Sequence, residues 1–518
     1  MRENEIKKET REDVTIWQPF MKSSAVCASV FLFMLFIFVA IIMPMHFPDT
    51  ADILTTLTSH KYHLNNTKFS ETPRPKIEIP VNCTTYEATK TCPSDYPTTY
   101  NPEEDRDRPP PPTCPDFFRW IYEDLKPWAE TGISRENVER AKDMGLANFR
   151  LVILKGKAYL ETYRRSFQTR DLFSLWGILQ LLRRYPGRVP DLDLMFNCGD
   201  PPMVLSRLFT GINATTVPPV FNYCKDKEHL DIIFPDWSFW GWAEINIRPW
   251  DPLLKDIKVG NNKTKWVNKD PYAFWKGNPT VAQTRRDLLR CNPTPTQDWN
   301  ARLFVNDWRR EERTGFRQSN LADQCTHRYK IYIEGVAWSV SQKYILACDS
   351  VPLIIHPRFY DFFSRGLIPL HHYWPVKDYD KCRSIKFAVE WGNSHLKEAE
   401  EMGKATSEFI QEDLKMDNVY DYMFHSLNEY AKLLTYEPTI PEKATELCSE
   451  AMACKERGLH KEFMLQSQVK SPADRGPCAM PPPFSPASLH SFLQRKTDTI
   501  KEVDLMEKQY YENQTKKP

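Results

Sequence analysis

The residue best suited to do chemistry is a carboxylate that follows a predicted strand. Residues 189–202 read VPDLDLMFNCGDPP, in which an apolar strand over 192–197 runs into a turn that contains Asp200. In open α/β sheets, ligands bind beyond the carboxyl ends of the strands. We therefore predict that Asp200 is the catalytic residue. A capped turn before Pro201 is the alternative that the sequence leaves open.

Two further carboxylates in the same segment, Asp191 and Asp193, resemble the metal-binding pattern Asp-x-Asp. They precede or begin the strand instead of following it, so we expect a solvated strand entry and no metal site. A glycoside hydrolase would need two carboxylates on opposite sides of a cleft. Residues i and i+2 of a strand lie only about 7 Å apart on one face, which argues against this class.

Aromatic residues are dense in residues 234–242, which read FPDWSFWGW. Large aromatic rings can stack on a sugar or on a base. Trp237 and Trp240 are therefore candidate substrate-binding residues, and packing in the core is the alternative that the sequence leaves open.

Two strand–turn–helix segments could hold a phosphate. In residues 272–287 a strand containing Lys276 ends at Gly277, and a helix-compatible run with basic residues in its first turns follows. In residues 330–341 a strand ends at Gly335, and a helix is predicted from about residue 339. Backbone N–H groups at a helix start and nearby cations favour an anion. Neither segment matches the Walker or GxGxxG patterns.

The elements that must position these residues alternate between strand-like and helix-like patterns from about Cys114 onward, which indicates an α/β architecture. The sequence predicts a hairpin over 148–160, a helix over 172–185 and long helices over 394–434. Further strands are predicted over 192–197, 303–306, 330–333 and 353–356. The Cys- and Pro-containing tail from about residue 441 is predicted to be an extension that wraps around the folded part.

The N-terminal region predicts a membrane anchor. Residues 24–43 carry no charge, and about 20 such residues span a bilayer. Basic residues precede this span and none follows it before Lys61, so we predict a cytosolic tail at 1–23 and a lumenal remainder, the type II orientation. Residues 44–113 are rich in Thr, Ser and Pro and are predicted to form a stem. Three cysteines are expected to tie this stem down locally: Cys83, Cys92 and Cys114.

Sequons and cysteines agree with a lumenal location. Every N-glycosylation sequon follows the predicted span, and the candidate acceptors are Asn65, Asn82, Asn213, Asn262 and Asn513. Of the 13 cysteines, all but Cys27 follow the span, and their even number suits disulfides in an oxidising compartment. The formal net charge of +1 gives no global field that would attract nucleic acid.

Taken together, these segments resemble glycosyltransferase family 90, over about residues 114–437 and in its plant-type branch. The resemblance implies a GT-B fold with two Rossmann-like domains facing a cleft. The acceptor domain would be 114–266, the UDP-sugar domain with its closing helices 267–440, and the extension 441–518. The resemblance also implies that Asp200 is the catalytic base and that Cys325 and Cys348 form a disulfide. Residues implied at the UDP-sugar are Lys276, Asn278, Arg286, Val336, Ala337, Trp338, Ser339, Val340 and Ser341.

The predicted activity is inverting transfer of glucose or xylose from UDP-glucose or UDP-xylose to a hydroxyl of a glycan or glycoprotein. No tightly bound cofactor and no metal are expected, because protein cations can neutralise the diphosphate. The expected location is the Golgi membrane, with the endoplasmic reticulum as the second choice. The alternative is a non-catalytic lumenal protein that binds a sugar or UDP, or a scaffold with a transferase fold.

Overall fold

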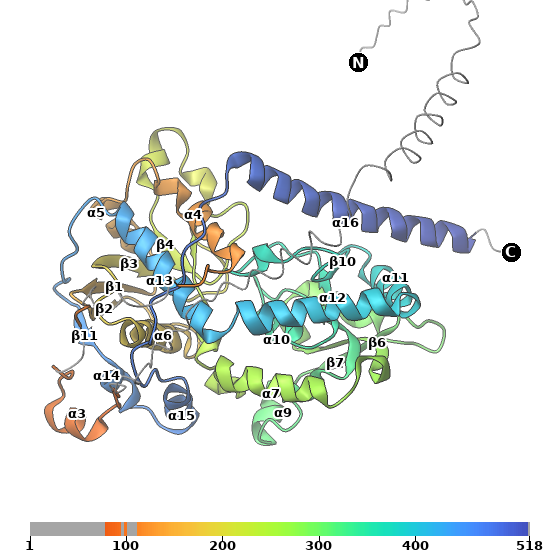
Figure 1. Cartoon of the computed structure of the whole chain (residues 1–518), viewed down its shortest axis with the longest axis horizontal. Coiled ribbons are helices and arrows are strands. Elements are labelled where there is room, and N and C mark those ends of the chain that lie inside the picture. Colours follow the sequence, from red (N-terminus) through yellow and green to blue (C-terminus); the bar gives the residue numbers. More distant parts are fainter. Residues whose placement is uncertain (1–77, 95–97, 101–110, 516–518) are drawn as a thin grey trace, which may run out of the picture. The chain divides into compact units, whose positions relative to one another are not determined.

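The structure is a computed structural model that describes residues 78–94, 98–100 and 111–515 (Figure 1). The predicted cytosolic tail, the predicted anchor at 24–43 and most of the predicted stem lie outside these residues. Within the described ranges, no helix is both long and apolar enough to cross a membrane.

The first sheet is mixed and has the strand order β11-β2-β1-β3-β4-β5. Its strands are β1 (Phe149–Leu154), β2 (Lys157–Thr162), β3 (Leu192–Phe196), β4 (Val220–Asn222), β5 (Ile232–Ile233) and β11 (Thr445–Leu447). β1 and β2 form the predicted hairpin, in which the turn residues Lys155 and Gly156 both have positive φ. That backbone is the one required by a two-residue turn between right-twisted strands. β3, β4 and β5 run parallel, so their carboxyl ends lie at one edge.

The second sheet is entirely parallel and has the order β10-β9-β8-β6-β7. Its strands are β6 (Asp270–Gly277), β7 (Ala301–Val305), β8 (His327–Tyr332), β9 (Val351–Ile355) and β10 (Trp374–Val376). The chain proceeds outward from β6 to β7 and then returns to the other side of β6 with β8. In doubly wound sheets, the point between two such strands is where ligands bind, beyond their carboxyl ends.

Helices flank both sheets (Figure 1). Those that precede the second sheet are α3 (Cys83–Thr89), α4 (Trp120–Leu125), α5 (Arg135–Asp143), α6 (Arg170–Arg184) and α7 (Trp250–Asn262). Those from the second sheet onward are α8 (Gln283–Leu288), α9 (Trp308–Arg313), α10 (Ser341–Leu346), α11 (Lys381–Ser394), α12 (Leu396–Glu408), α13 (Met416–Leu433), α14 (Ser449–Ala453), α15 (Gly458–Gln466) and α16 (Pro486–Thr515). The predicted α/β class is therefore confirmed.

Each sheet has its own hydrophobic core. The core around the second sheet includes Trp275, Ile331 and Leu353, whereas the core around the first sheet includes Phe196 and Phe221. Helix α13 follows the second sheet in the chain but packs in the core of the first, where the hydroxyl of Tyr430 donates to the backbone oxygen of Asp193 at 2.8 Å. The chain thus returns to the first half after completing the second.

Buried ion pairs hold the carboxyl edges of the two sheets against each other. Lys343 on α10 lies 3.1 Å from the carboxylate of Asp236, which follows β5. Asp124 on α4 accepts from Arg365 at 2.7 Å and lies 2.8 Å from Lys225, which follows β4. All five side chains are buried, and a buried charge is tolerated only where it is paired. Segments that follow strands of both sheets therefore meet at one interface.

Disulfides join the described part of the predicted stem, and Cys114 directly after it, to the tail. The pairs are Cys83–Cys454, Cys92–Cys448 and Cys114–Cys478, with sequence separations of 371, 356 and 364 residues. The expectation that these cysteines tie the stem down locally is therefore wrong. The tail folds back along the first sheet, where β11 pairs with β2 and α14 lies against α3, and this brings the partner cysteines to the stem.

The tail also contains a long helix, α16, that reaches from one half of the structure to the other (Figure 1). Near its start, Phe492 lies 6.3 Å from Trp120 between ring centroids. Further along, the Glu507 carboxylate accepts from Ser384 at 2.8 Å, and the Tyr511 hydroxyl donates to the Arg383 backbone oxygen at 2.8 Å. The tail therefore packs as part of the folded unit.

Candidate active site

Asp200 follows β3 at the carboxyl edge of the first sheet, as predicted. Its side chain is 32% exposed, and Arg170 at the start of α6 donates to Oδ1 at 2.8 Å and to Oδ2 at 3.4 Å. The backbone oxygen of Asp200 accepts from the Cys224 thiol at 3.3 Å. The carboxylate is thus fixed from one side by a cation and reachable by solvent from the other.

At the second sheet, the predicted phosphate segments meet around Arg285 on α8. Its Nε donates to the Glu334 backbone oxygen at 2.8 Å, and one terminal nitrogen donates to the Asn278 backbone oxygen at 3.3 Å. The other terminal nitrogen donates to the Ile333 backbone oxygen at 3.2 Å and to the Ser339 Oγ at 3.0 Å. Arginine has five N–H donors, so one remains for a ligand. The side chain joins the ends of β6 and β8 to the loop after β8.

The charge of Arg285 has no carboxylate partner within 4 Å among the described residues. Burial lowers the pKa of its guanidinium, and the nearby Tyr332 and Asp200 oppose that shift. The group stays charged at neutral pH because an arginine pKa lies far above 7. An uncompensated cation at a strand end suits an anionic ligand.

Hydrogen bonds between its own residues and the end of β8 stabilise the loop after β8. The hydroxyl of Tyr332 accepts from the backbone N–H of Ser339 at 3.1 Å, and the hydroxyls of Ser339 and Ser341 lie 2.8 Å apart. Ala337 and Trp338 are buried, Val340 is half-buried, and Val336 is 57% exposed. Val336 is therefore the residue of this loop that is most open to a ligand.

The other residues predicted to contact the UDP-sugar differ in their burial and in their hydrogen-bond partners. Asn278 is half-buried, and its side-chain oxygen accepts from the Thr280 backbone N–H at 2.9 Å, whereas Lys276 donates to the Gln318 backbone oxygen. Arg286 is exposed, next to the half-buried Arg285. The sequence therefore missed Arg285 as the side chain that joins the segments.

Neither predicted stacking residue presents a face to solvent. Trp240 is fully buried, and its indole N–H donates to the Tyr420 hydroxyl at 3.0 Å. Trp237 is 1% exposed and packs against Trp338 and Trp242, with ring centroids 6.1 and 5.2 Å apart. Both rings pack as core residues, which was the alternative that the sequence left open.

Glu334, which follows β8, is a partly buried carboxyl whose pKa is raised toward neutral pH. Burial raises the pKa of its carboxyl to about 7, while the backbone N–H groups of Phe359 and Arg358 and the Arg358 guanidinium oppose the shift. The Phe359 N–H donates to Oε1 at 2.7 Å. The folded state therefore favours the protonated carboxyl over a range in which the unfolded chain is ionised.

We predict a pH-dependent stability from this carboxyl. A raised folded-state pKa contributes stability that is fully present below about pH 4.5 and is lost as pH rises through 7, by about 3 kcal/mol over the whole range. Glu334→Gln should therefore raise the unfolding midpoint at pH 8 more than at pH 5.5. Thermal denaturation of both proteins across this range measures the difference, and parallel pH curves would contradict the assignment.

The Asp-x-Asp carboxylates have structural partners. Asp193 is buried and accepts both arms of a fork from Arg150, at 2.7 and 2.6 Å, and a bond from the Tyr436 hydroxyl at 2.8 Å. Asp191 accepts from the Lys155 backbone N–H at 2.6 Å. Neither carboxylate lies at the carboxyl edge with Asp200. The expected solvated strand entry fits the exposed Asp191 but is wrong for Asp193, which is buried because Arg150 neutralises its charge.

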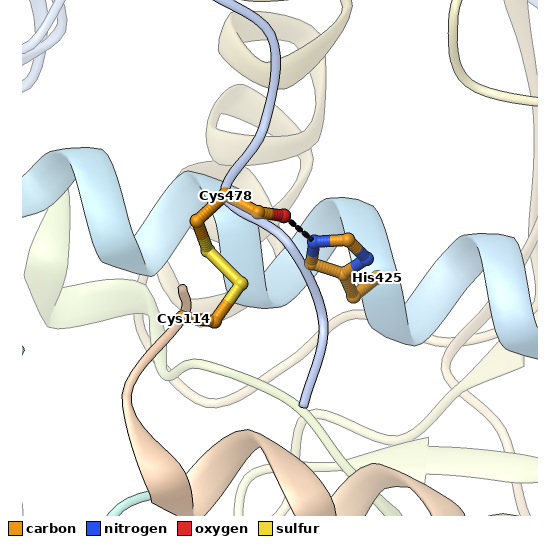
Figure 2. Close-up of side chains that lie close together, drawn as sticks. All are labelled: Cys114, His425 and Cys478. Carbon is orange, nitrogen blue, oxygen red and sulfur yellow. Dashed lines mark hydrogen bonds between the residues drawn. A yellow bond between two sulfur atoms is a disulfide. The ribbon is translucent and has the colours of Figure 1, made fainter. Parts of the chain in front are cut away.

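Within the described residues, one group of potential metal ligands is close together: Cys114, His425 and Cys478 (Figure 2). The two sulfur atoms form a disulfide, and a metal needs thiolates. The His425 Nε2 donates to the Cys478 backbone oxygen at 2.8 Å. The cluster is therefore a covalent and hydrogen-bonded anchor for the tail.

Five disulfides are present among the described residues, which indicates an oxidising compartment. They include the implied Cys325–Cys348 pair, and a further one joins Cys291 and Cys382. Asn65 lies outside the described residues. The other candidate glycosylation acceptors are exposed: Asn82, Asn213, Asn262 and Asn513.

Comparisons with known proteins show to which family the chain belongs. The family model for glycosyl transferase family 90 matches residues 110–507, so the resemblance extends beyond the predicted end at 437 and includes most of the tail. The O-glucosyltransferase rumi of Drosophila melanogaster is 26% identical over 61% of this chain and 77% of its own length. Protein O-glucosyltransferase 1 is 28% identical in Bos taurus and 27% in Homo sapiens, over 63% of this chain and 83% and 82% of those proteins. The chain belongs to glycosyltransferase family 90.

Proposed function

We propose that this chain is an inverting glycosyltransferase that moves glucose from UDP-glucose, or xylose from UDP-xylose, to a hydroxyl of a glycoprotein or glycan. Family membership and the names of its relatives support glycosyl transfer, with glucose as the first candidate sugar. The single observation that carries the proposal is that Asp200 lies at the carboxyl edge of the first sheet and Arg285 at that of the second, and that the buried Lys343–Asp236 pair joins segments that follow these edges. Asp200 offers a base, and Arg285 offers an uncompensated cation.

The proposed reaction is a single displacement. Asp200 takes the proton of the acceptor hydroxyl while the hydroxyl oxygen attacks the anomeric carbon of the donor. The bond from that carbon to the diphosphate oxygen breaks, and UDP leaves with the electron pair. One displacement inverts the configuration, so an α-linked donor gives a β-linked product.

The proposed donor site lies at the ends of β6 and β8. Arg285, with its one free N–H, would contact the departing diphosphate, and the exposed loop residue Val336 would lie beside it. Lys276, Asn278 and the remaining loop residues to Ser341 would shape the pocket. Arg286, which the family resemblance implies, is the competing diphosphate contact. We propose that these protein cations make a metal unnecessary.

The remaining proposals concern architecture and location. The two sheets would form the two halves of a GT-B enzyme, with donor and acceptor meeting between them. Residues 24–43 would anchor the protein with its catalytic part in the lumen of the Golgi, or of the endoplasmic reticulum. The disulfides and the exposed sequons support a lumenal location.

A donor panel tests the proposed function. We expect UDP and one UDP-sugar to raise the thermal midpoint of the full-length protein, with the same shift in the presence of EDTA. Slow release of UDP from that sugar nucleotide should accompany binding, with water as the acceptor. Stabilisation without any UDP release, even with glycoprotein acceptors, would favour the non-catalytic binding protein. No response to UDP, UDP-glucose or UDP-xylose would reject the proposed donor site.

A further inference from the structure

Arg170, a residue that the sequence did not single out, lies between the proposed base and two aromatic rings. It is the first residue of α6 and is 6% exposed. Its guanidinium carbon lies 4.6 Å from the ring centroid of Trp237 and 5.3 Å from that of Phe167, while its terminal nitrogens donate to both oxygens of Asp200. The fork of the side chain therefore meets the carboxylate, and the rings hold its plane.

We propose that Arg170 is a positioning residue that holds the Asp200 carboxylate in the orientation that receives the acceptor proton. This inference rests on the proposed function, in which Asp200 is the base. An ionised carboxylate has about four lone-pair positions, and a fork occupies one on each oxygen. With its side chain 32% exposed, Asp200 keeps positions that an acceptor hydroxyl can reach.

The burial of Arg170 distinguishes this pair from an ordinary surface ion pair. Exposed pairs contribute about 0 to 1 kcal/mol because solvent screens them and both side chains lose freedom. Here the cation is buried, and among the described residues Asp200 is the one carboxylate within 4 Å of it. A guanidinium does not release its proton in proteins, so it fixes the carboxylate without competing for the proton that arrives.

The rings also connect this pair to the donor side. Trp237 lies 5.0 Å from Tyr223 and 6.1 Å from Trp338 between ring centroids. Trp338 precedes Ser339, whose hydroxyl accepts from Arg285. Packed side chains thus run from the base to the proposed diphosphate contact, which would keep the two groups in a constant relation.

Two substitutions in the full-length protein test the role. We expect Arg170→Gln to lower the rate constant of UDP release, from whichever of UDP-glucose and UDP-xylose is turned over, by about 10²-fold, because misplacement by about 1 Å has that effect. The KM for the donor and the affinity for UDP should change by less than about threefold. Arg170→Lys keeps the charge but loses the forked guanidinium. Its rate constant of UDP release should therefore lie between those of the wild-type protein and Arg170→Gln. The exposed Arg165, in the segment before α6, provides the control, Arg165→Gln.

Chemical rescue separates positioning from folding. Millimolar guanidinium should restore part of the lost activity to Arg170→Ala, and it should restore none to Arg170→Ala combined with Asp200→Asn. Full activity in Arg170→Gln, or a loss that follows reduced UDP affinity and is not rescued, would overturn the positioning role while leaving Asp200 as the base. UDP release that is unaffected by Asp200→Asn would instead overturn the proposed mechanism itself.

Discussion

Asp200→Asn is expected to lower the rate of glycosyl transfer by about 10² to 10⁴-fold, the range that a positioned general base contributes. An amide cannot accept the acceptor proton, so the hydroxyl must attack without being deprotonated. The affinity for UDP should change little, because Asp200 lies at the first sheet and the proposed diphosphate site at the second. Initial-rate kinetics together with calorimetric titration of UDP measures both quantities.

Asp191→Asn is the matched control for this experiment. Asp191 is exposed and lies nine positions earlier in the same segment, at the other end of β3. We expect its activity to stay within about twofold, as for most surface positions away from a site. Equal losses from both substitutions would mean that the carboxylate at the strand end has no special role.

Arg285→Gln should weaken UDP binding and lower kcat/KM by about 10² to 10³-fold, which is typical of removing a donor that stabilises developing charge. The loss has two sources. The substitution removes the uncompensated cation, and it removes bonds to the backbone oxygens of Glu334, Asn278 and Ile333. Part of the effect will therefore appear as a lower unfolding midpoint, which thermal denaturation without ligand measures.

Arg286→Gln separates the neighbouring arginines. The side chain of Arg286 is exposed, so this variant should keep its stability and lose less than about threefold in kcat/KM. The reverse result, with Arg286 essential and Arg285 dispensable, would restore the assignment that the family resemblance implies.

The sequence predicted the central elements well because their patterns are local. The hairpin of β1 and β2 follows from apolar runs around Lys155 and Gly156, and α6 from apolar residues at helical spacing. The tail contains no local apolar pattern from which its fold could be predicted. Among the residues of α16, only Val503 and Glu507 are buried, so the helix has little apolar periodicity of its own. Its position depends on contacts with α11 and with the region around Trp120.

The site residues differ in how far a local pattern identifies them. Asp200 was predictable because a strand followed by a Gly-Asp-Pro turn places it at a sheet edge. The choice between Arg285 and Arg286 was not, because neighbours on a helix point about 100° apart and the inward one depends on the residue at which the helix begins. Arg170 was hidden for a different reason: its partner lies 30 positions away, across a strand and a helix.

The aromatic segment shows a further limit. A dense run of Trp and Phe predicts a large apolar surface, but both a sugar platform and a core satisfy that prediction. The two rings lie in the core because they pack with residues far along the chain: Trp240 donates to Tyr420, and Trp237 contacts Trp338. Sequence spacing alone carries no information on such partners.

The most direct test of the account is the structure of the full-length protein with bound UDP. We expect the diphosphate beyond the ends of β6 and β8, with an oxygen within hydrogen-bonding distance of the free N–H of Arg285. The β-phosphate, which would carry the sugar, should point toward Asp200. UDP bound away from Arg285, or with its diphosphate directed away from the first sheet, would contradict the proposed arrangement of donor and base.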